Sequence, residues 1–321
     1  MSQQSVLYDV PGPRQRRLTL IGSAVATVLL LVGAYFLIYR PLNDKGQFSM
    51  ELWGPLIDPS NENFSLVWKR IGTGFKNTLT AAALAIVCSL VVGTLLAVLR
   101  IQLKSLTRRR FTGFATPLAY LLRGLSLFLS GLTRVCVEVF RGLPVVITIF
   151  FVARGFPEFG VSFDTLWYLV IGLTIYNSVV IAEILRSGME GLPGGQAEAA
   201  SAIGLSPSQT TRMILLPQAF RIMLPALISQ LVVVLKDTSL GFIISYEETL
   251  NIGKQIIGAL DNPIQVYIVI AVLFILVNYS LSKLAQYVQH RLSRGRKTAG
   301  TPAQNPPPAA LTAQAEGTGA A

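Results

Sequence analysis

The sequence is poor in the residues that carry most protein chemistry. Its 321 residues include one histidine, His290, and two cysteines, Cys88 and Cys136, which both fall in apolar stretches. One histidine in a basic tail is too little for a histidine-based metal site or for histidine acid–base catalysis. Since a thiol in an apolar segment usually acts as a small hydrophobic filler, no disulfide is expected either. The sequence therefore predicts no metal site and no catalytic residue.

A phosphate-binding loop is also missing. The nearest match to the pattern G-x-x-x-x-G-K-[ST] is NIGKQ (251–255), but Gln255 follows the lysine and Glu248 occupies the position of the first glycine. We expect that the chain is not an enzyme and that it binds no cofactor of its own.

Charged residues are scarce, at 13% of the chain, whereas hydrophobic residues make up 52%. This composition is typical of a membrane protein. Apolar stretches near the roughly 20 residues that a helix needs to cross a bilayer occur at 18–38, 78–99, 135–152, 166–185, 216–235 and 264–285. Backbone polar groups in lipid must be satisfied within the segment, and no stretch alternates as a barrel strand does. We predict an all-α integral membrane protein with about six transmembrane helices.

The basic residues predict how the chain is oriented in the bilayer. The net charge is +11, from 27 lysines and arginines against 16 acids. With the amino terminus in the cytoplasm, the inner segments hold 18 of the basic residues and the outer segments hold 8. The positive-inside rule favours this orientation, with both termini cytoplasmic. No basic and aromatic surface pattern accompanies the charge, so we expect contact with the lipid bilayer and none with nucleic acid.

Composition divides the chain further. The expected parts are a cytoplasmic tail (1–17), an additional transmembrane helix (18–39), an extracytoplasmic segment (40–77), a core (78–286) and a disordered cytoplasmic tail (287–321). A helix at the membrane surface is expected near 65–75. The stretch 118–132 is apolar but short and contains Arg123, so it is either a surface helix or an early start to the third span. If it crossed the bilayer by itself, the inner excess of basic residues would be lost.

The loop after the fourth span is polar and contains several glycine and proline residues that interrupt regular structure. Its run AEAASAI (197–203) favours a short helix, and Gly204 stands where a left-handed residue would end it. The following SPSQ (206–209) has the pattern of a capping box with proline at the first helical position. Pro217 interrupts the pattern before the next span. We predict two short helices joined by a glycine turn, which suit either a groove on a soluble partner or an ordinary hairpin between spans.

The same loop resembles the EAA loop of ABC importer permeases. The residues that carry the resemblance, at the spacing of that loop, are Glu198, Ala199, Ala200, Gly204, Ile214, Leu216 and Pro217. Neighbouring segments are similar to the polar amino-acid permease family: NTLTAAALAIVCSLVVGTLLAVLR (77–100), VEVFRGLPVVITIFF (137–151), AEILRSGMEGLPGGQ (182–196) and LKDTSL (235–240). The resemblance covers about residues 70 to 285.

The resemblance implies a permease that works with other subunits. It would pair with a second permease, identical or homologous, and each EAA loop, near 193–217, would seat in a cleft of a dimeric cytoplasmic ATPase that hydrolyses the ATP. A separate extracytoplasmic binding protein would deliver the amino acid. Glu198, Ala199, Ala200 and Gly204 would be the coupling contacts, and the stretch from Ile214 to Pro217 would shape the return to the membrane.

The resemblance also implies a fold, a location and a substrate. Many family members have about five spans, so the core at 78–286 would be a five-helix permease, to which this chain adds its first helix. The expected location is the bacterial cytoplasmic membrane. The start SVLYDVPGPRQRR (5–17) and the long tail are similar to glutamate-importer permeases of high-GC Gram-positive bacteria. Glutamate is therefore the expected substrate.

Ionisable side chains inside the spans are costly and are candidates for a functional site. Glu138 and Arg141 are three residues apart, as are Glu183 and Arg186, so each pair could meet on one helix face and neutralise itself. In this interpretation the charge pairs have a structural role and do not contact the substrate. The alternative is that the acids and Arg141 line a path for the substrate.

The stretch 236–239 combines an acid, a base and two hydroxyls at the end of a span. A break in the helix there would expose backbone groups. Asp237 would bind the ammonium group of an amino acid, and Thr238, Ser239 or free N–H groups would bind its carboxylate, unless these residues only cap the helix. The candidate path residues are Lys236, Asp237, Thr238, Ser239, Glu183, Glu138 and Arg141.

Two other classes of function stay open. An ion-coupled secondary carrier would explain charges within the membrane but not the spacing of the EAA loop. A non-transporting membrane scaffold would explain the docking loop alone.

Overall fold

The computed structural model describes residues 12–108 and 116–294, and every element within these ranges is a helix. Six helical stretches among the described residues are long and apolar enough to cross a bilayer. They are Pro13–Asp44, Phe64–Thr107, Leu118–Gly142, Thr165–Glu190, Pro207–Ile244 and Pro263–Val288. The predicted all-α fold with about six spans is confirmed.

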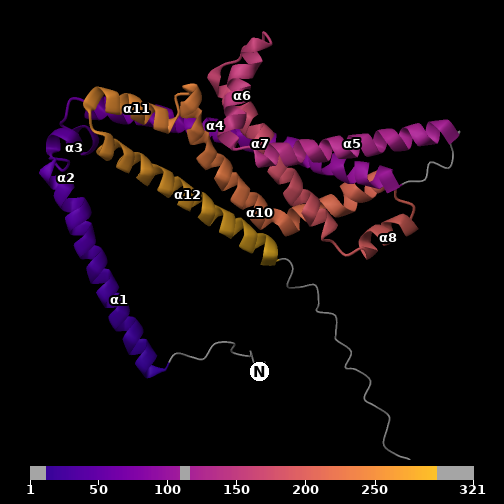
Figure 1. Ribbon diagram of the computed structural model, residues 1–321, viewed down its shortest axis with the longest axis horizontal. Coiled ribbons are helices and arrows are strands. Elements are labelled where there is room, and N and C mark those ends of the chain that lie inside the picture. Colours follow the sequence, from indigo (N-terminus) through magenta and orange to yellow (C-terminus); the bar gives the residue numbers. More distant parts are fainter. Residues whose placement is uncertain (1–11, 109–115, 295–321) are drawn as a thin grey trace, which may run out of the picture.

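The helices follow one another through short connections. The α-helices are α1 (Pro13–Ala34), α2 (Arg40–Asp44), α3 (Met50–Ile57), α4 (Phe64–Arg108), α5 (Thr116–Gly142), α6 (Val145–Glu158), α7 (Thr165–Glu190), α8 (Gly195–Ala202), α9 (Pro207–Gln209), α10 (Leu216–Asp237), α11 (Thr249–Leu260) and α12 (Pro263–Arg294). Tyr35–Tyr39 and Thr210–Leu215 are π-helical, and Thr238–Ile244 is a 3-10 helix. Figure 1 shows α3 and α11 at one end of the molecule and α8 at the other.

The third span was predicted in the wrong place. Residues 135–152 do not form one helix, because α5 ends at Gly142 and α6 begins at Val145, with Pro144 between them in an extended conformation. Proline disfavours a helical conformation in the residue before it, and hydropathy alone does not register this break. The stretch 118–132 is instead continuous with residues up to 142 in α5, as the early start to a span would require. The expected number of six spans is unchanged.

Several helices extend beyond the predicted boundaries. The surface helix expected near 65–75 is the beginning of α4, which runs without interruption for 45 residues from Phe64 to Arg108. Helix α1 takes in residues 13–17 of the predicted amino-terminal tail, and α12 takes in residues 287–294 of the predicted carboxy-terminal tail. The remaining parts of both tails, 1–11 and 295–321, lie outside the described residues.

Small residues bring α4 and α7 together at the centre of the molecule. A β-carbon on Gly93 would lie 2.8 Å from both the Ser178 carbonyl oxygen and a methyl carbon of Ile181. Ala85 and Ala97, on either side of Gly93 in α4, have no exposed surface. The backbones can therefore approach closely, as is usual for helices that pack within a bilayer.

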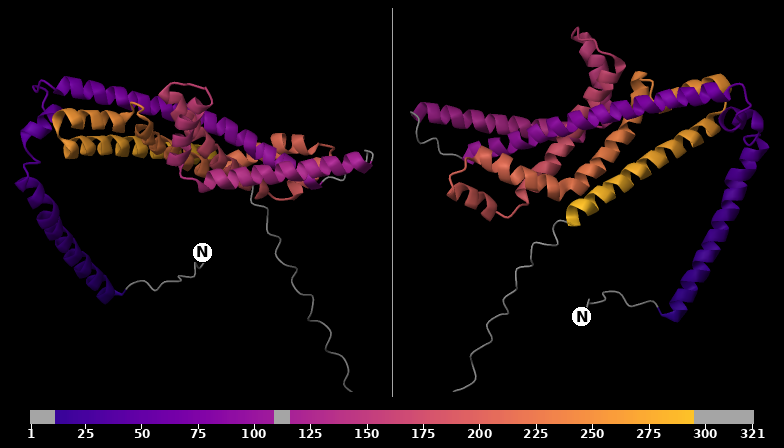
Figure 2. Two further views of the ribbon diagram at one scale, coloured as in Figure 1. Left: turned by 45° about the horizontal axis from the view of Figure 1, so that its top comes forward. Right: turned by 180° about the vertical axis from the view of Figure 1, so that it is seen from behind.

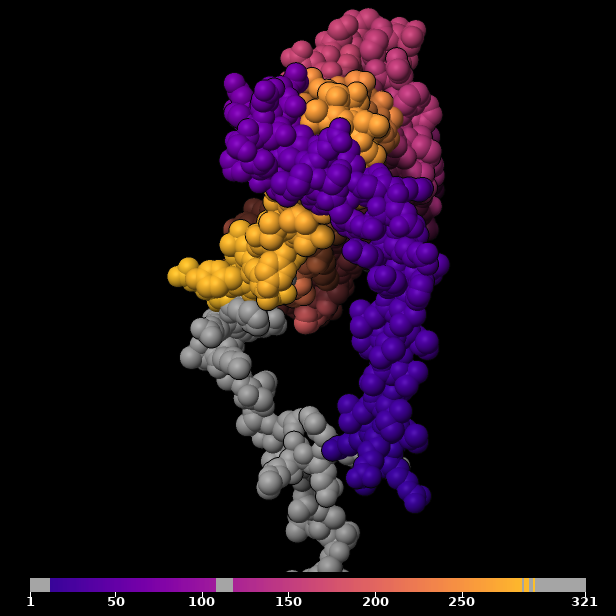
Figure 3. Space-filling model, turned by 90° about the vertical axis from the view of Figure 1, so that its left-hand side faces the viewer, coloured from indigo at the N-terminus to yellow at the C-terminus, as the bar shows by residue number. Residues whose placement is uncertain are grey.

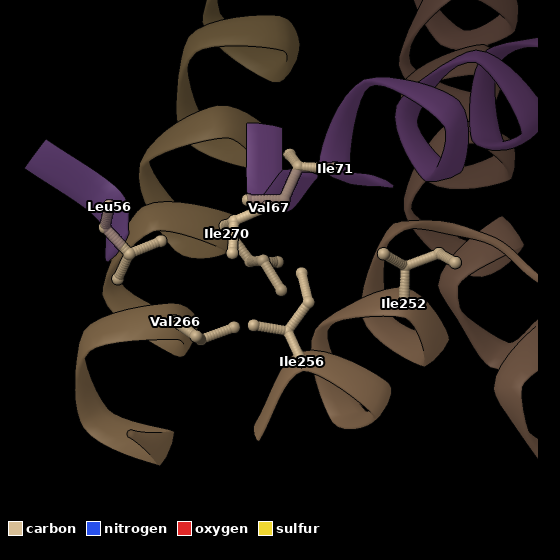
Figure 4. Packing of buried hydrophobic residues seen from close by; sticks show 7 residues of the cluster. All are labelled: Leu56, Val67, Ile71, Ile252, Ile256, Val266 and Ile270. Carbon is tan, nitrogen blue, oxygen red and sulfur yellow. The ribbon is translucent and has the colours of Figure 1, made fainter. Parts of the chain in front are cut away.

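Apolar side chains form separate clusters along the molecule. Figure 4 shows the cluster where α3, α4, α11 and α12 meet, formed by Leu56, Val67, Ile71, Ile252, Ile256, Val266 and Ile270. At the opposite end, buried residues of α4, α7 and α10 form another cluster, which consists of Ala97, Ile181, Ala182, Leu185, Met189, Ala219 and Leu227. Each end of the molecule thus has its own apolar packing.

Among the residues that the structure describes, helix α1 is joined to the other helices through its connection to α3. None of its residues is buried, and Figures 2 and 3 show it standing apart from the other helices. The connection from Gln47 to α3 is fixed from the far end of the chain, because Gln265 Nε2 donates to the Gln47 carbonyl at 2.6 Å and Asn262 Nδ2 donates to the Leu52 carbonyl at 3.1 Å. The additional helix is therefore attached to the core at the end that carries α3.

A buried carboxylate caps α11. Ser245 adopts a left-handed conformation with φ of 62°, and the chain then turns into α11 at Glu248. The Glu248 carboxylate, which has no exposed surface, accepts hydrogen bonds from the N–H groups of Leu250 and Asn251, both at 2.7 Å. These bonds satisfy free N–H groups in the first turn of the helix.

We expect Gly93→Ala to weaken the α4–α7 contact, because its β-carbon would collide with the backbone of α7. Overpacking of this kind costs about 1–3 kcal/mol, which should appear as a lower apparent melting temperature of the purified protein in detergent. Gly258→Ala in α11 is the matched control, since no atom lies within 4 Å of its β-carbon. The same melting temperature for Gly93→Ala and the wild type would contradict the close approach.

Stability should also depend on the protonation of Glu248. Burial raises the pKa of this carboxyl to about 7, although the hydrogen bonds from Leu250 and Asn251 lower it. The folded protein therefore binds the proton more tightly than the unfolded chain, and stability should fall as the pH rises from about 4.5 to about 7. Glu248→Gln should flatten the melting-temperature curve in this window. Parallel curves for the wild type and the variant would show that the carboxyl does not titrate as expected.

Candidate functional site

The loop between α7 and α10 has the local structure that the sequence predicts. Helix α8 ends at Ala202, and Gly204 follows with φ of +82°. The Gly204 N–H donates to the Ser201 carbonyl and the Leu205 N–H donates to the Ala200 carbonyl, both at 3.0 Å. This pair of bonds is a Schellman motif, in which the left-handed residue satisfies the last carbonyls of the helix.

The capping box after the turn is confirmed as well. The Gln209 N–H donates to Ser206 Oγ at 3.3 Å, and the Ser206 N–H donates to Gln209 Oε1 at 2.8 Å, with Pro207 at the first helical position. The second helix, however, does not end before the span. It passes through the π-helical segment Thr210–Leu215 directly into α10. This wider turn accommodates Pro217, which has no N–H and would crowd the carbonyl one turn earlier.

The loop presents one edge to solvent. The side chains of Glu198 and Ala199 and the backbone at Gly204 are exposed, whereas Ala200 is only 1% exposed and packs inside the loop. Two large apolar side chains of the same loop are also exposed, Ile203 at 75% and Met213 at 65%. Sequence analysis did not single out these two residues, although an isoleucine directly before a glycine turn is a recognisable signal for an exposed apolar contact. We call the set Glu198, Ala199, Ile203, Gly204 and Met213 the exposed edge.

The inner side of the loop is tied to the spans. Leu216 is half-buried and packs, with Leu215, against the apolar cluster of α4, α7 and α10. Ile214 is half-buried, Pro217 is exposed, and the Gln218 amide donates to Gln196 Oε1 at 2.6 Å. The segment from Ile214 to Pro217 therefore lies at the base of the loop, at the point where α10 begins.

The stretch 236–239 lies near the other end of the molecule. Helix α10 changes to a 3-10 helix at Thr238, and the helical path ends only at Ser245. Thr238 Oγ1 donates to the Leu235 carbonyl at 2.6 Å and Ser239 Oγ donates to the Lys236 carbonyl at 2.8 Å. The hydroxyls are thus used in capping. Asp237 is half-buried and, among the described residues, accepts no hydrogen bond and forms no ion pair, which leaves its carboxylate available.

The turn after this 3-10 helix is fastened to α4. Tyr246 Oη donates to the Asn77 carbonyl at 3.1 Å, and Asn77 Nδ2 donates to the Glu247 carbonyl at 2.8 Å. Thr78 Oγ1 lies 2.8 Å from Thr249 Oγ1 and accepts a bond from the Thr249 N–H at 3.1 Å. We call residues 245–249 the outer turn.

One of the two predicted charge pairs is present in the structure, and the other is not. Glu183 accepts from Arg186 Nε at 3.0 Å, as expected, and also from Arg100 Nη1 at 2.6 Å. Glu138 does not pair with Arg141, because Arg134 Nε, one turn earlier on the same helix face, lies 2.9 Å from the Glu138 carboxylate. Spacing along one helix allows either partner, so the sequence could not distinguish them.

The structure does not bring all the candidate path residues together. Glu183 lies near the base of the loop, whereas Asp237 is the last residue of α10 and is followed by the 3-10 helix that leads to the outer turn. Glu138 is exposed on α5. Only Lys236, Asp237, Thr238 and Ser239 form one local group. Whether any of these residues binds a substrate stays a prediction.

A polar contact in the middle of the spans escaped sequence analysis. Gln230 Nε2 of α10 donates to Asn177 Oδ1 of α7 at 2.7 Å, and Asn177 has no exposed surface. Amides inside apolar spans are a detectable signal, since polar groups there are costly and usually have a defined partner. The pair therefore joins α7 to α10 within the bundle.

The described residues show no metal centre, since no three His, Cys, Asp or Glu side chains among them come together as ligands. A cavity of about 600 Å³ lies between α4, α5 and α7, with Cys88, Cys136 and Trp167 among its lining residues. Its lining is almost entirely apolar. Such a surface suits hydrocarbon rather than a polar solute, so this cavity is not part of the candidate path.

Comparison with known proteins places these features in a family. Residues 114–294 match the family described as the binding-protein-dependent transport system inner membrane component. The glutamate transport system permease protein GluD of Corynebacterium glutamicum is 37% identical over 259 residues, which cover 79% of this chain and 85% of that protein. The probable glutamine ABC transporter permease protein GlnP of Bacillus subtilis is 38% identical over 166 residues, which cover 51% of this chain and 76% of that protein.

Solved structures show a similar fold. The crystal structure of an amino acid ABC transporter with histidines has a TM-score of 0.56 at 23% identity and covers 72% of this chain and 99% of its own. An inward-facing structure of the MetNI methionine ABC transporter also has a TM-score of 0.56, at 21% identity and with the same coverage. At these identities the likeness concerns the fold alone. The family match covers more than half of the 321 residues of the chain. The chain therefore belongs to the binding-protein-dependent transport system inner membrane components.

Proposed function

We propose that this chain is the translocation subunit of an ATP-driven importer for a polar amino acid, and that its substrate is glutamate. The observation that carries the proposal is the exposed edge of the α8 loop, in which a charged residue, small residues and two large apolar side chains are all exposed within one short, capped loop. Uncovered apolar side chains on a polar loop are typical of a surface that binds another protein. The naming of the Corynebacterium relative supports glutamate as the substrate.

The ATP would be hydrolysed by a separate ATPase, and the exposed edge would seat in a cleft of that protein. Glu198, Ala199, Ile203 and Met213 would contact the ATPase, and Gly204 would give the edge its shape. Ala200 would act inside the loop, holding α8 in place. The chain itself would have no catalytic role and would bind no cofactor.

The excess of basic residues supports an orientation with α8 and both termini in the cytoplasm. The membrane would be the bacterial cytoplasmic membrane. A second permease, identical or homologous, would complete the translocation path, and a binding protein would deliver glutamate at the end that carries α3 and α11. Asp237, at the end of α10, would be the first acceptor for the ammonium group, with the Lys236 ammonium near the carboxylate.

The proposal predicts that Glu198→Lys disrupts the complex with the ATPase. Charge reversal on the exposed edge should abolish capture of an ATPase when the solubilised permease is purified, because the docking surface would carry the wrong sign. Capture is scored by identifying the co-purifying proteins and by their ATP hydrolysis.

Glu62→Lys is the matched control, because Glu62 is also exposed but precedes α4 at the other end of the molecule. It should capture the ATPase as the wild type does. If the intact wild-type protein captured no ATPase, the importer proposal would fail. Equal capture by both variants would instead exclude Glu198 from the docking surface.

Gly204 provides a second, graded test. Its φ of +82° strains any other residue, although no atom lies within 4 Å of the β-carbon position. Left-handed backbone costs an L-residue about 1–2 kcal/mol, and asparagine tolerates it better than β-branched residues do. Uptake by membranes that contain the whole complex should therefore fall from wild type to Gly204→Asn to Gly204→Val, while the amount of permease in the membrane stays constant.

Gly160→Val serves as the control for strain itself. Gly160 also has a positive φ, of +76°, and an empty surrounding, but it lies in the α6–α7 connection. It should retain ATPase capture. Wild-type uptake by Gly204→Val would refute the role assigned to the glycine turn.

A further inference from the structure

Five charged side chains join α4 to the end of α7 in a continuous chain of alternating sign. Arg100 Nη1 donates to Glu183 Oε2 at 2.6 Å, Arg186 bridges Glu183 and Glu190, and Lys104 Nζ donates to Glu190 Oε1 at 2.6 Å. We call Arg100, Lys104, Glu183, Arg186 and Glu190 the stem network. Sequence analysis anticipated only its Glu183–Arg186 contact.

The stem network is more than a set of surface ion pairs. The side chains of Arg100 and Glu183 are only 16% and 25% exposed, in contrast to the Arg40–Asp44 pair, whose side chains are 63% and 66% exposed. Exposed pairs contribute little, but the loss of one partner from a poorly solvated pair leaves a charge without compensation. The network therefore fixes how α4 and α7 lie relative to each other at this point.

The network lies directly at the base of the α8 loop. Glu190 is the last residue of α7, and α8 begins at Gly195. On the other side of α7, a β-carbon on Gly188 would lie 2.5 Å from Met223 and 3.3 Å from Ala219 of α10. The end of α7 is thus held between α4 and α10. A displacement of α8 cannot move the end of α7 without also displacing α4.

Helix α4 connects this base with the other end of the molecule. Asn77 and Thr78, in its first half, hold the outer turn through the hydrogen bonds described above. Asn77 and Arg100 lie on one uninterrupted helix, so about 35 Å of continuous helix separates them at 1.5 Å per residue. A helix with its backbone hydrogen bonds intact moves as a stiff rod over this distance.

We propose that the stem network makes α4 the element that carries movement of the α8 loop to the outer turn, with Arg100 and Glu183 as positioning residues. The inference rests on the proposed function, in which an ATPase moves α8. It adds the route by which that movement reaches the outer turn. Neither residue needs to touch the substrate or the ATPase.

The test uses the complete complex, purified with its ATPase and binding protein and reconstituted into lipid vesicles. The number of ATP molecules hydrolysed for each glutamate taken up is measured. Arg100→Gln should capture the ATPase normally but raise this ratio at least tenfold, since hydrolysis would continue without moving the outer turn. Arg100→Lys should restore most of the coupling, because a lysine ammonium can replace the single bond from Nη1 to Glu183.

Arg40→Gln is the matched control. It removes a cation from an ion pair that is exposed and lies outside the network, so the ratio should stay at the wild-type value. If Arg100→Gln fails to fold, Thr78→Val tests the other end of the route with a side chain of nearly the same shape. It should also raise the ratio.

The outcomes separate this inference from the proposed function. If the wild type captures no ATPase, the proposed function fails before any variant is compared. An unchanged ratio in Arg100→Gln or, where that variant does not fold, in Thr78→Val would refute transmission through α4. It would leave the proposed function unaffected. Loss of both ATPase capture and uptake in Arg100→Gln would also refute the inference, since the network would then only shape the docking loop.

Discussion

The close approach of α4 and α7 at Gly93 is the contact on which the rest of the structure depends. The approach leaves no room for a β-carbon there, so the two backbones meet with their relative position fixed. Ala85 and Ala97 extend the contact on either side, and the ion pairs from Arg100 and Lys104 continue it to the base of the α8 loop. Within a bilayer the hydrophobic effect does not drive helices together, so close packing and polar contacts must do so.

Local features of this protein could be predicted from the sequence because their causes are local. The glycine turn and the capping box in the α8 loop depend on residues within five positions of one another, and both occur as expected. The number of spans also follows from hydropathy. The position of the third span does not, because a window of average hydropathy runs through Pro144 as if the helix continued.

Contacts between distant segments could not be predicted in the same way. Arg100 and Glu183 are 83 positions apart, and nothing in either neighbourhood shows that parallel packing of α4 and α7 brings them together. The same holds for Gln230 and Asn177 and for the bonds from Asn77 to the outer turn. The candidate path residues were grouped by chemistry alone, and the structure separates Glu183 from Asp237 because they belong to opposite ends of the bundle.

The two ends of α4 use polar groups in different ways, and this difference fits a division of roles. At the α8 end the contacts are between full charges on poorly exposed side chains, and Arg186 bridges Glu183 and Glu190. At the other end Asn77 Nδ2 donates to the Glu247 carbonyl and the Thr249 N–H donates to Thr78 Oγ1, and these bonds cannot shift far without breaking. Movement entering at the α8 end therefore passes from α7 to α4, and the outer turn must either follow α4 or release it. An arrangement of this kind favours two discrete positions of the outer turn over a continuous range.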